Sequence, residues 1–323
     1  MSSSIFLSSD VVIFIFLESI LFFLLTLSLY FVILILKNWD FKSTTALQYG
    51  LEKKSYLVTL IIYFTIALKL LLLPYFVYSI DILSNIVPGA MCGAGVISAN
   101  EYGESLLILK TFILFFTSLW LVINQEDIKE KEFPYIKKKF FYFIFIFILI
   151  TLEFYLNIKY FSNISTDSIV TCCSAIYSSV GDTNPLPLSM NLQALLISFY
   201  FIYILSFISN LKKLFIVSAV LSSTFLYISY YALLYFFGTY IYELPTHHCP
   251  FCMLQKDYFY IGYLIFISLF LGTFYGIVNL GLKLIIKKEI TKYYIYSNIF
   301  NTIFIFICTF YVLNYYIKNG VLL

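Results

Sequence analysis

VVIFIFLESILFFLLTLSLYFVILIL, residues 11–36, is an apolar run in which Glu18 is the single charged residue. A helix needs about 20 predominantly apolar residues to cross a hydrocarbon layer roughly 30 Å thick. Backbone in contact with lipid must also satisfy its hydrogen bonds within its own segment, so the run predicts a transmembrane helix. Similar runs continue toward the C-terminus, at residues 56–80, 105–124, 140–158, 192–210, 214–238, 258–282 and 295–317.

The composition of the chain agrees with these runs. Of its 323 residues, 62% are hydrophobic and 11% are charged, and the mean hydropathy is +0.94. A soluble domain carries about 25% charged residues, so this chain has too few to cover itself in water. We predict an all-α integral membrane protein, a bundle of about eight transmembrane helices that forms one polytopic domain over residues 1–323. Its predicted partner is the lipid bilayer, and the scattered basic residues predict no nucleic-acid surface.

The lysines indicate how the helices are oriented. They concentrate in alternate loops, whereas the remaining loops and ends hold few of the 20. Because lysine-rich loops stay in the cytoplasm, we expect both termini and the other set of loops on the outer side, the periplasmic side of a bacterial inner membrane. The lysine-rich loops are residues 37–54, 129–139, 212–213 and 283–292, and the longest outer loops are residues 81–104, 159–191 and 239–257.

Five of the six cysteines fall in these outer loops. Outside the cytoplasm thiols form disulfides or do redox work, so their grouping predicts a thiol site. Because five is odd, at least one of them lacks a partner within the chain unless it binds something else. Cys308 lies inside a predicted helix, where a cysteine is usually a small apolar filler. The outer cysteines are Cys92 in the first loop, Cys172 and Cys173 in the second, and Cys249 and Cys252 in the third.

The pair in the third loop has the most specific spacing. Residues 247–253 read HHCPFCM, so His247 and His248, the two histidines of the chain, come directly before Cys249-Pro-Phe-Cys252. Two intervening residues let both thiols meet when the second cysteine begins a helix. A helix N-terminus lowers the pKa of a thiol and makes the thiolate available as a nucleophile or ligand. We expect the seventh transmembrane helix to begin here.

Residues 249–256, CPFCMLQK, resemble the Cys-x-x-Cys-x-x-Gln-Arg signature of the DsbB family of disulfide-forming membrane proteins. The order of the motifs, with loop cysteines before the CxxC pair, is more similar to the vitamin K epoxide reductase family. The resemblance covers eight residues, Lys256 stands where the signature has arginine, and the chain has about twice the helices of either family. It implies a quinone bound near the pair, with Gln255 and Lys256 as its contacts.

These observations lead to a hypothesis of membrane thiol–disulfide oxidoreduction. Cys249 and Cys252 would cycle between dithiol and disulfide, and Cys92, Cys172 or Cys173 would exchange with them through a mixed disulfide. Electrons would pass to a quinone at the membrane edge. The expected partner is a periplasmic thiol protein. Tyrosines that follow the pair, at positions 258, 260 and 263, are candidates to line the quinone site, although interfacial tyrosines are usually part of the aromatic belt.

A metal site is the first alternative. Thiolates with methionine and histidine suit a soft ion such as copper(I), and zinc would find four ligands among the same residues. The protein would then be a copper or zinc transporter, or an assembly factor that passes the ion to a metalloprotein. A disulfide-stapled structural membrane subunit is the second alternative. The candidate ligands are Met91, Cys92, Cys172, Cys173, His247, His248, Cys249, Cys252 and Met253.

Four charges fall within the predicted helices. Charged side chains inside a bilayer are costly and usually face protein or water. Lys69 lies deepest, and Glu18 lies at a depth that allows an ion pair with it. Lys110 and Glu153 lie nearer the helix ends, where side chains can snorkel to the interface.

Overall fold

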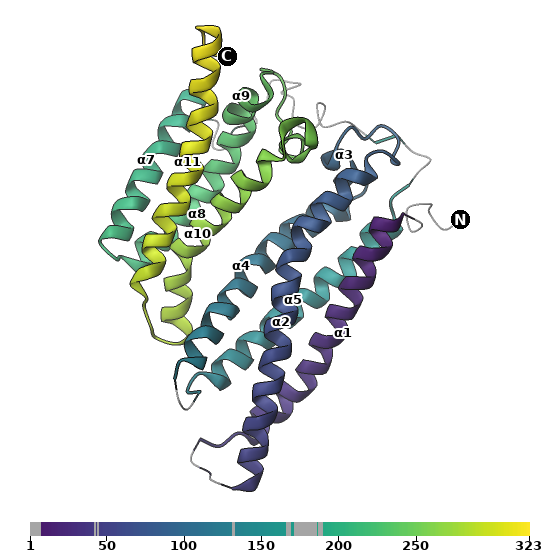
Figure 1. Ribbon diagram of the computed structural model, residues 1–323, viewed down its shortest axis with the longest axis vertical. Coiled ribbons are helices and arrows are strands. Elements are labelled where there is room, and N and C mark those ends of the chain that lie inside the picture. Colours follow the sequence, from purple (N-terminus) through teal and green to yellow (C-terminus); the bar gives the residue numbers. More distant parts are fainter. Residues whose placement is uncertain are drawn as a thin grey trace. The chain divides into compact units, whose positions relative to one another are not determined.

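The computed structural model describes residues 8–41, 43, 45–130, 133–165, 169–170, 186 and 190–323. Within these ranges the regular structure is helical, and eight helices are long and apolar enough to cross a membrane. Each of the eight predicted runs corresponds to one of them, so the prediction of an all-α multi-pass membrane bundle is confirmed (Figure 1). Which side each loop and terminus faces stays a prediction of the lysine pattern.

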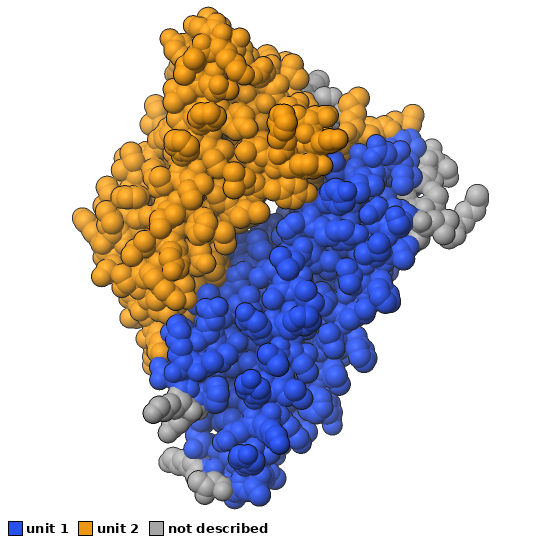
Figure 2. Space-filling model, viewed as in Figure 1, with its two compact units in different colours: residues 1–88, 97–168 blue, residues 89–96, 169–323 orange. Residues whose placement is uncertain are grey.

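The chain divides into two compact units (Figure 2). Unit 1 comprises residues 1–88 and 97–168, and unit 2 comprises residues 89–96 and 169–323. The segment around Cys92 therefore belongs to the same unit as the CxxC pair, although in the sequence it lies between two segments of unit 1. The description of the whole chain as one polytopic domain stays a prediction.

Unit 1 is a ring of four helices. α1 packs on α2 and α5, and α4 packs on α2 and α5. Its core is a stripe of large apolar side chains that includes Trp120, which is fully buried and donates its indole N–H to the carbonyl of Lys139. The opposite faces of the same helices expose many large apolar residues, as expected where lipid is the solvent. The helices are α1 (Ser9–Asn38), α2 (Ala46–Leu83), α4 (Tyr102–Ile128) and α5 (Ile136–Ser162).

Unit 2 repeats this arrangement with different packing. α7 packs on α8 and α11, and α10 packs on α8 and α11. Two glycines of α10, Gly272 and Gly276, let the helices approach closely: an added Cβ at Gly276 would lie 1.9 Å from Ser222 Oγ. The long helices are α7 (Leu192–Leu211), α8 (Phe215–Ala232), α10 (Ile261–Ile285) and α11 (Thr291–Asn319).

Three of the cysteines, Cys92, Cys249 and Cys252, lie in or next to short elements of unit 2. α8 continues through a π-helical segment, η3 (Leu233–Phe237), into α9 (Gly238–Tyr242), and the whole stretch counts as one span. α3 (Gly93–Ile97) follows Cys92, and two 3-10 turns, η4 (Cys252–Leu254) and η5 (Lys256–Tyr258), precede α10.

One loop lysine is placed differently from the sequence expectation. Lys139 lies within α5 and is buried, with Nζ 2.7 Å from Asp127 Oδ2 and 3.1 Å from Asn124 Oδ1. The helix begins at Ile136, before the apolar run, and the Asp127 carboxylate on α4 neutralises the buried ammonium group.

Candidate functional site

Cys92 is positioned by a tight turn before α3. Gly89 has φ of +82°, and a Cβ there would lie 2.6 Å from the carbonyl oxygen of Val170, so both the backbone conformation and the space require glycine. After the turn, the amide of Gly95 donates to the carbonyl of Cys92. The Cys92 side chain is fully buried as a result.

The CxxC loop is held from behind by Tyr242, the last residue of α9. Its hydroxyl donates to the carbonyl of Cys249 and accepts from the amide of Met253, 3.2 Å away. One phenol thus fixes the backbone on both sides of the pair. Glu243, directly after it, adopts a left-handed conformation with φ of 54°, which ends α9 and turns the chain into the loop.

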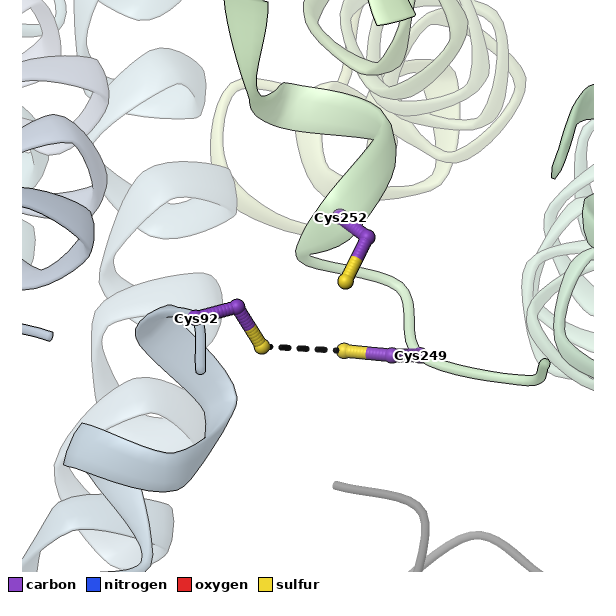
Figure 3. A group of neighbouring side chains, drawn as sticks. All are labelled: Cys92, Cys249 and Cys252. Atoms are coloured by element: carbon purple, nitrogen blue, oxygen red, sulfur yellow. Dashed lines mark hydrogen bonds between the residues drawn. The ribbon is translucent and has the colours of Figure 1, made fainter. Parts of the chain in front are cut away.

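The three cysteine sulfurs converge in unit 2. Figure 3 shows the side chains of Cys92, Cys249 and Cys252 pointing toward one another. Cys92 Sγ lies 3.4 Å from Cys249 Sγ, and all three sulfurs lie within 4.8 Å of one another. All three side chains are buried. The 3.4 Å separation is a hydrogen-bond contact and is longer than the S–S bond of about 2.0 Å. No two sulfurs of the described residues are therefore at disulfide distance, whereas Cys172 and Cys173, which a disulfide staple could also use, lie outside those residues.

The expectation that a transmembrane helix begins at the CxxC pair is wrong. Cys252 begins only the three-residue turn η4, and α10 begins at Ile261. Phe259 and Tyr260 both have positive φ, of 53° and 56°, and this left-handed pair separates the turns from the helix. A single 3-10 turn has little macrodipole, so the site lacks the thiolate stabilisation that a long helix would supply.

The two histidines have different surroundings. His248 Nδ1 lies 3.0 Å from the carbonyl oxygen of Leu234, and its ring packs on Tyr235 with centroids 5.2 Å apart. The ring of His247 packs edge to face on Tyr242 at 4.5 Å, and its Nε2 is buried without a hydrogen-bond partner among the described residues. Burial lowers the pKa of His247, while nearby Cys92 opposes the shift and His248 adds to it. Burial thus favours the neutral form of the His247 imidazole.

The remaining predicted residues are spread out. Met91 is 76% exposed, whereas Met253 is buried. Gln255 is half-buried and Lys256 is exposed. Cys308 is buried within α11, as expected for an apolar filler. Cys172 and Cys173 lie outside the described residues.

A cavity in unit 2 lies near the CxxC loop. Its volume is about 230 Å³. Tyr258 connects it to the cysteine loop, because its ring packs on Tyr242 at 4.8 Å. Burial and the neighbouring Cys252 and Asp257 raise the pKa of Tyr258. Of the three tyrosines suggested as a quinone lining, only Tyr258 lines this cavity. The remaining lining residues were not expected from the sequence pattern, and they include Tyr240, Glu243, Phe259, Tyr311 and Lys318.

Comparison of the chain with protein-family models, with curated proteins and with solved structures finds no match.

The intramembrane charges form a second constellation, in unit 1. Lys69 Nζ lies 2.7 Å from Glu18 Oε2, so the two residues form the ion pair that their depths allow. Lys110 and Glu153 join it, with Lys110 Nζ 2.6 Å from Glu153 Oε1 and Lys69 Nζ 3.0 Å from Glu153 Oε2. The fourth contact, from Lys110 to Glu18, is 3.6 Å. The four helices of unit 1 thus each contribute one charge to a neutral, buried ring, which we call the charge quartet.

The snorkelling expectation for Lys110 and Glu153 is wrong. Both side chains are buried, because each points between helices toward an opposite charge. Lys110 Nζ also lies 4.5 Å from the centroid of the Phe76 ring, within cation–π distance. One turn along α5 from Glu153, both amide atoms of buried Asn157 lack a hydrogen-bond partner among the described residues.

Proposed function

We propose that this membrane protein is a thiol–disulfide oxidoreductase that uses Cys249, Cys252 and Cys92. The observation that carries the proposal is the 3.4 Å contact between the sulfurs of Cys92 and Cys249, with the Cys252 sulfur in the same group. Thiol–disulfide exchange needs a third sulfur within reach of a CxxC disulfide. Here that sulfur comes from a segment 157 residues away in the chain.

The exchange step balances without an outside oxidant. The thiolate of Cys92 attacks the Cys249 sulfur of a Cys249–Cys252 disulfide. The Cys92–Cys249 bond forms, the Cys249–Cys252 bond breaks, and Cys252 leaves as a thiolate. We assign Cys92 as the attacking group and Cys249 as the attacked one, because their sulfurs lie 3.4 Å apart. The disulfide moves in this step, and the total number of oxidised cysteines stays the same.

Net oxidation of a substrate thiol protein requires an electron acceptor, for which we propose a quinone. Reoxidation of the Cys249–Cys252 dithiol would give two electrons and two protons to the quinone and produce a quinol. The cavity beside Tyr258 suits an amphipathic ring, because tyrosines line it. Tyr258 packs on Tyr242, whose hydroxyl is hydrogen-bonded to the backbone of Cys249. The resemblance of residues 249–256 to the DsbB family supports the same acceptor, with half-buried Gln255 and exposed Lys256 as candidate contacts. We place the site on the periplasmic side of a bacterial inner membrane, with a periplasmic thiol protein as substrate.

The test is thiol trapping followed by mass spectrometry of the full-length protein in detergent. We expect Cys249 and Cys252 to be found partly as a disulfide that mild reductant opens, and quinone to restore it. Cys249→Ser should abolish quinone reduction by a dithiol. Cys308→Ser is the matched control, since this buried cysteine lies apart from the cluster, and it should leave the rate unchanged. A pair that never changes oxidation state would overturn the proposal.

Metal handling is the second candidate function. The observation in its favour is that all three sulfurs, not only one pair, lie within 4.8 Å of one another in a buried site. A soft ion such as copper(I) or zinc binds to such a group of thiolates. A transporter or a metalloenzyme assembly factor should purify with about one metal ion per chain and with its thiols protected from alkylation. An elemental count on the same sample distinguishes this outcome from the redox one.

A further inference from the structure

The spacing of the three sulfurs matches the coordination sphere of a tetrahedral zinc ion. Zinc–thiolate bonds are about 2.3 Å long, which places two sulfur ligands about 3.8 Å apart in a tetrahedron. Cys92 Sγ and Cys249 Sγ lie 3.4 Å apart, slightly closer than this value, and no two of the three sulfurs are more than 4.8 Å apart. Small side-chain rotations would bring the three sulfurs onto one ion.

A closed zinc site needs a fourth ligand, and among the described residues the surroundings of the cluster favour His247 over Met91 and His248. Met91 is 76% exposed. His248 Nδ1 already contacts the carbonyl oxygen of Leu234 at 3.0 Å. His247 has a buried Nε2 without a hydrogen-bond partner among the described residues, and its position in the chain is two residues before Cys249. An imidazole nitrogen of this kind is an ordinary zinc ligand.

We propose that the reduced protein binds one zinc ion through Cys92, Cys249, Cys252 and His247. Binding would deprotonate the three thiols and release their protons to solvent, as thiolates are the ligating form. The group of ligand atoms within 4.8 Å consists of the sulfurs alone, so the ring of His247 must turn toward them on binding. Tyr242 supports the arrangement at the cysteines, because its hydroxyl fixes the Cys249 backbone.

The zinc site goes beyond thiol exchange and acts on the same sulfurs. A cysteine pair that ligates zinc cannot be a disulfide at the same time, so the ion would hold the site reduced. The proposal rests on the positions of the sulfurs and of His247 and does not depend on quinone reduction. Zinc binding and disulfide exchange can therefore succeed or fail separately.

The experiment uses the full-length protein in detergent, reduced and stripped of metal with a chelator. Zinc is titrated in competition with a chromophoric chelator, and cobalt(II) is titrated separately to read thiolate charge transfer and tetrahedral geometry. We expect one zinc per chain and a tetrahedral cobalt spectrum. His247→Ala should weaken zinc binding by at least about tenfold, whereas His248→Ala, the matched control, should change it by less than about twofold.

A second variant tests whether misfolding explains the loss of zinc binding. His247→Gln keeps an uncharged polar side chain, and far-UV circular dichroism checks that the helices form in every variant. Equal effects of the His247 and His248 variants, or binding well below one zinc per chain, would overturn the proposal. The proposal would also be overturned if the protein bound copper(I) tightly without needing His247 and did not bind zinc stoichiometrically. Thiol trapping of His247→Ala without metal should still find the Cys249–Cys252 pair oxidisable, which keeps a failed zinc site distinct from a failed redox site.

Discussion

Removal of one carboxylate from the charge quartet should destabilise unit 1 strongly. In Glu153→Gln, Lys110 loses its 2.6 Å partner and Lys69 loses its 3.0 Å partner, while Glu18 alone remains to neutralise both. Breaking a buried ion pair by removing one member costs about 3–5 kcal/mol, because the remaining charge is left uncompensated. We expect a loss of about that size in the free energy of unfolding.

A second substitution should restore most of this loss. Glu153→Gln with Lys110→Met leaves the Glu18–Lys69 pair at 2.7 Å and a neutral core, and a buried pair replaced by neutral groups is often close to neutral in stability. Glu153→Gln with Lys69→Met is the matched control. It leaves Glu18 with Lys110, whose contact is 3.6 Å, so it should recover less.

The assay is equilibrium unfolding in mixed detergent and dodecyl sulfate micelles, followed by tryptophan fluorescence. The chain has two tryptophans, Trp39 and Trp120, and both are buried in unit 1, so the fluorescence reports on the unit that contains the quartet. The reasoning would be refuted if Glu153→Gln cost less than about 1 kcal/mol, or if the Lys110→Met double variant were no more stable than the single one.

Three further predictions concern stability. Asn157→Leu should stabilise the protein by about 1–3 kcal/mol in the same unfolding assay, because both amide atoms are buried without partners among the described residues, whereas Thr151→Leu on an exposed face should change little. Gly276→Ala should lower the free energy of unfolding by about 1–3 kcal/mol, because its Cβ would lie 1.9 Å from Ser222 Oγ. Gly50→Ala, with open space around it, should be neutral or stabilising. Both are measured by circular dichroism during unfolding, and equal effects would contradict the packing argument. The pKa of His247 is lowered in the folded state, so the unfolded chain binds a proton more readily. The melting temperature of the metal-free protein should therefore decline as the pH falls from about 7 to 5, and this decline should be smaller in His247→Gln.

The eight transmembrane helices could be predicted from the sequence because their cause is local. An apolar run of sufficient length must close its own backbone hydrogen bonds in lipid, whatever the rest of the chain does. The ion pair between Glu18 and Lys69 was also predictable, since depth along two helices places the charges at one level. Depth does not reveal which way a helix faces, however, and for this reason Lys110 and Glu153 were expected to snorkel and not to pair with this ion pair.

The sequence by itself determined that the five loop cysteines, and the two histidines before the CxxC pair, are the candidate chemistry of this protein. The tertiary structure decided which of them meet. Cys92 and Cys249 are 157 residues apart, and their contact depends on a glycine turn and on the hydroxyl of Tyr242. The structure also distinguished His247 from His248 and moved the start of α10 to Ile261. These features depend on side-chain partners and backbone angles in loops, and residue type and spacing alone do not fix them.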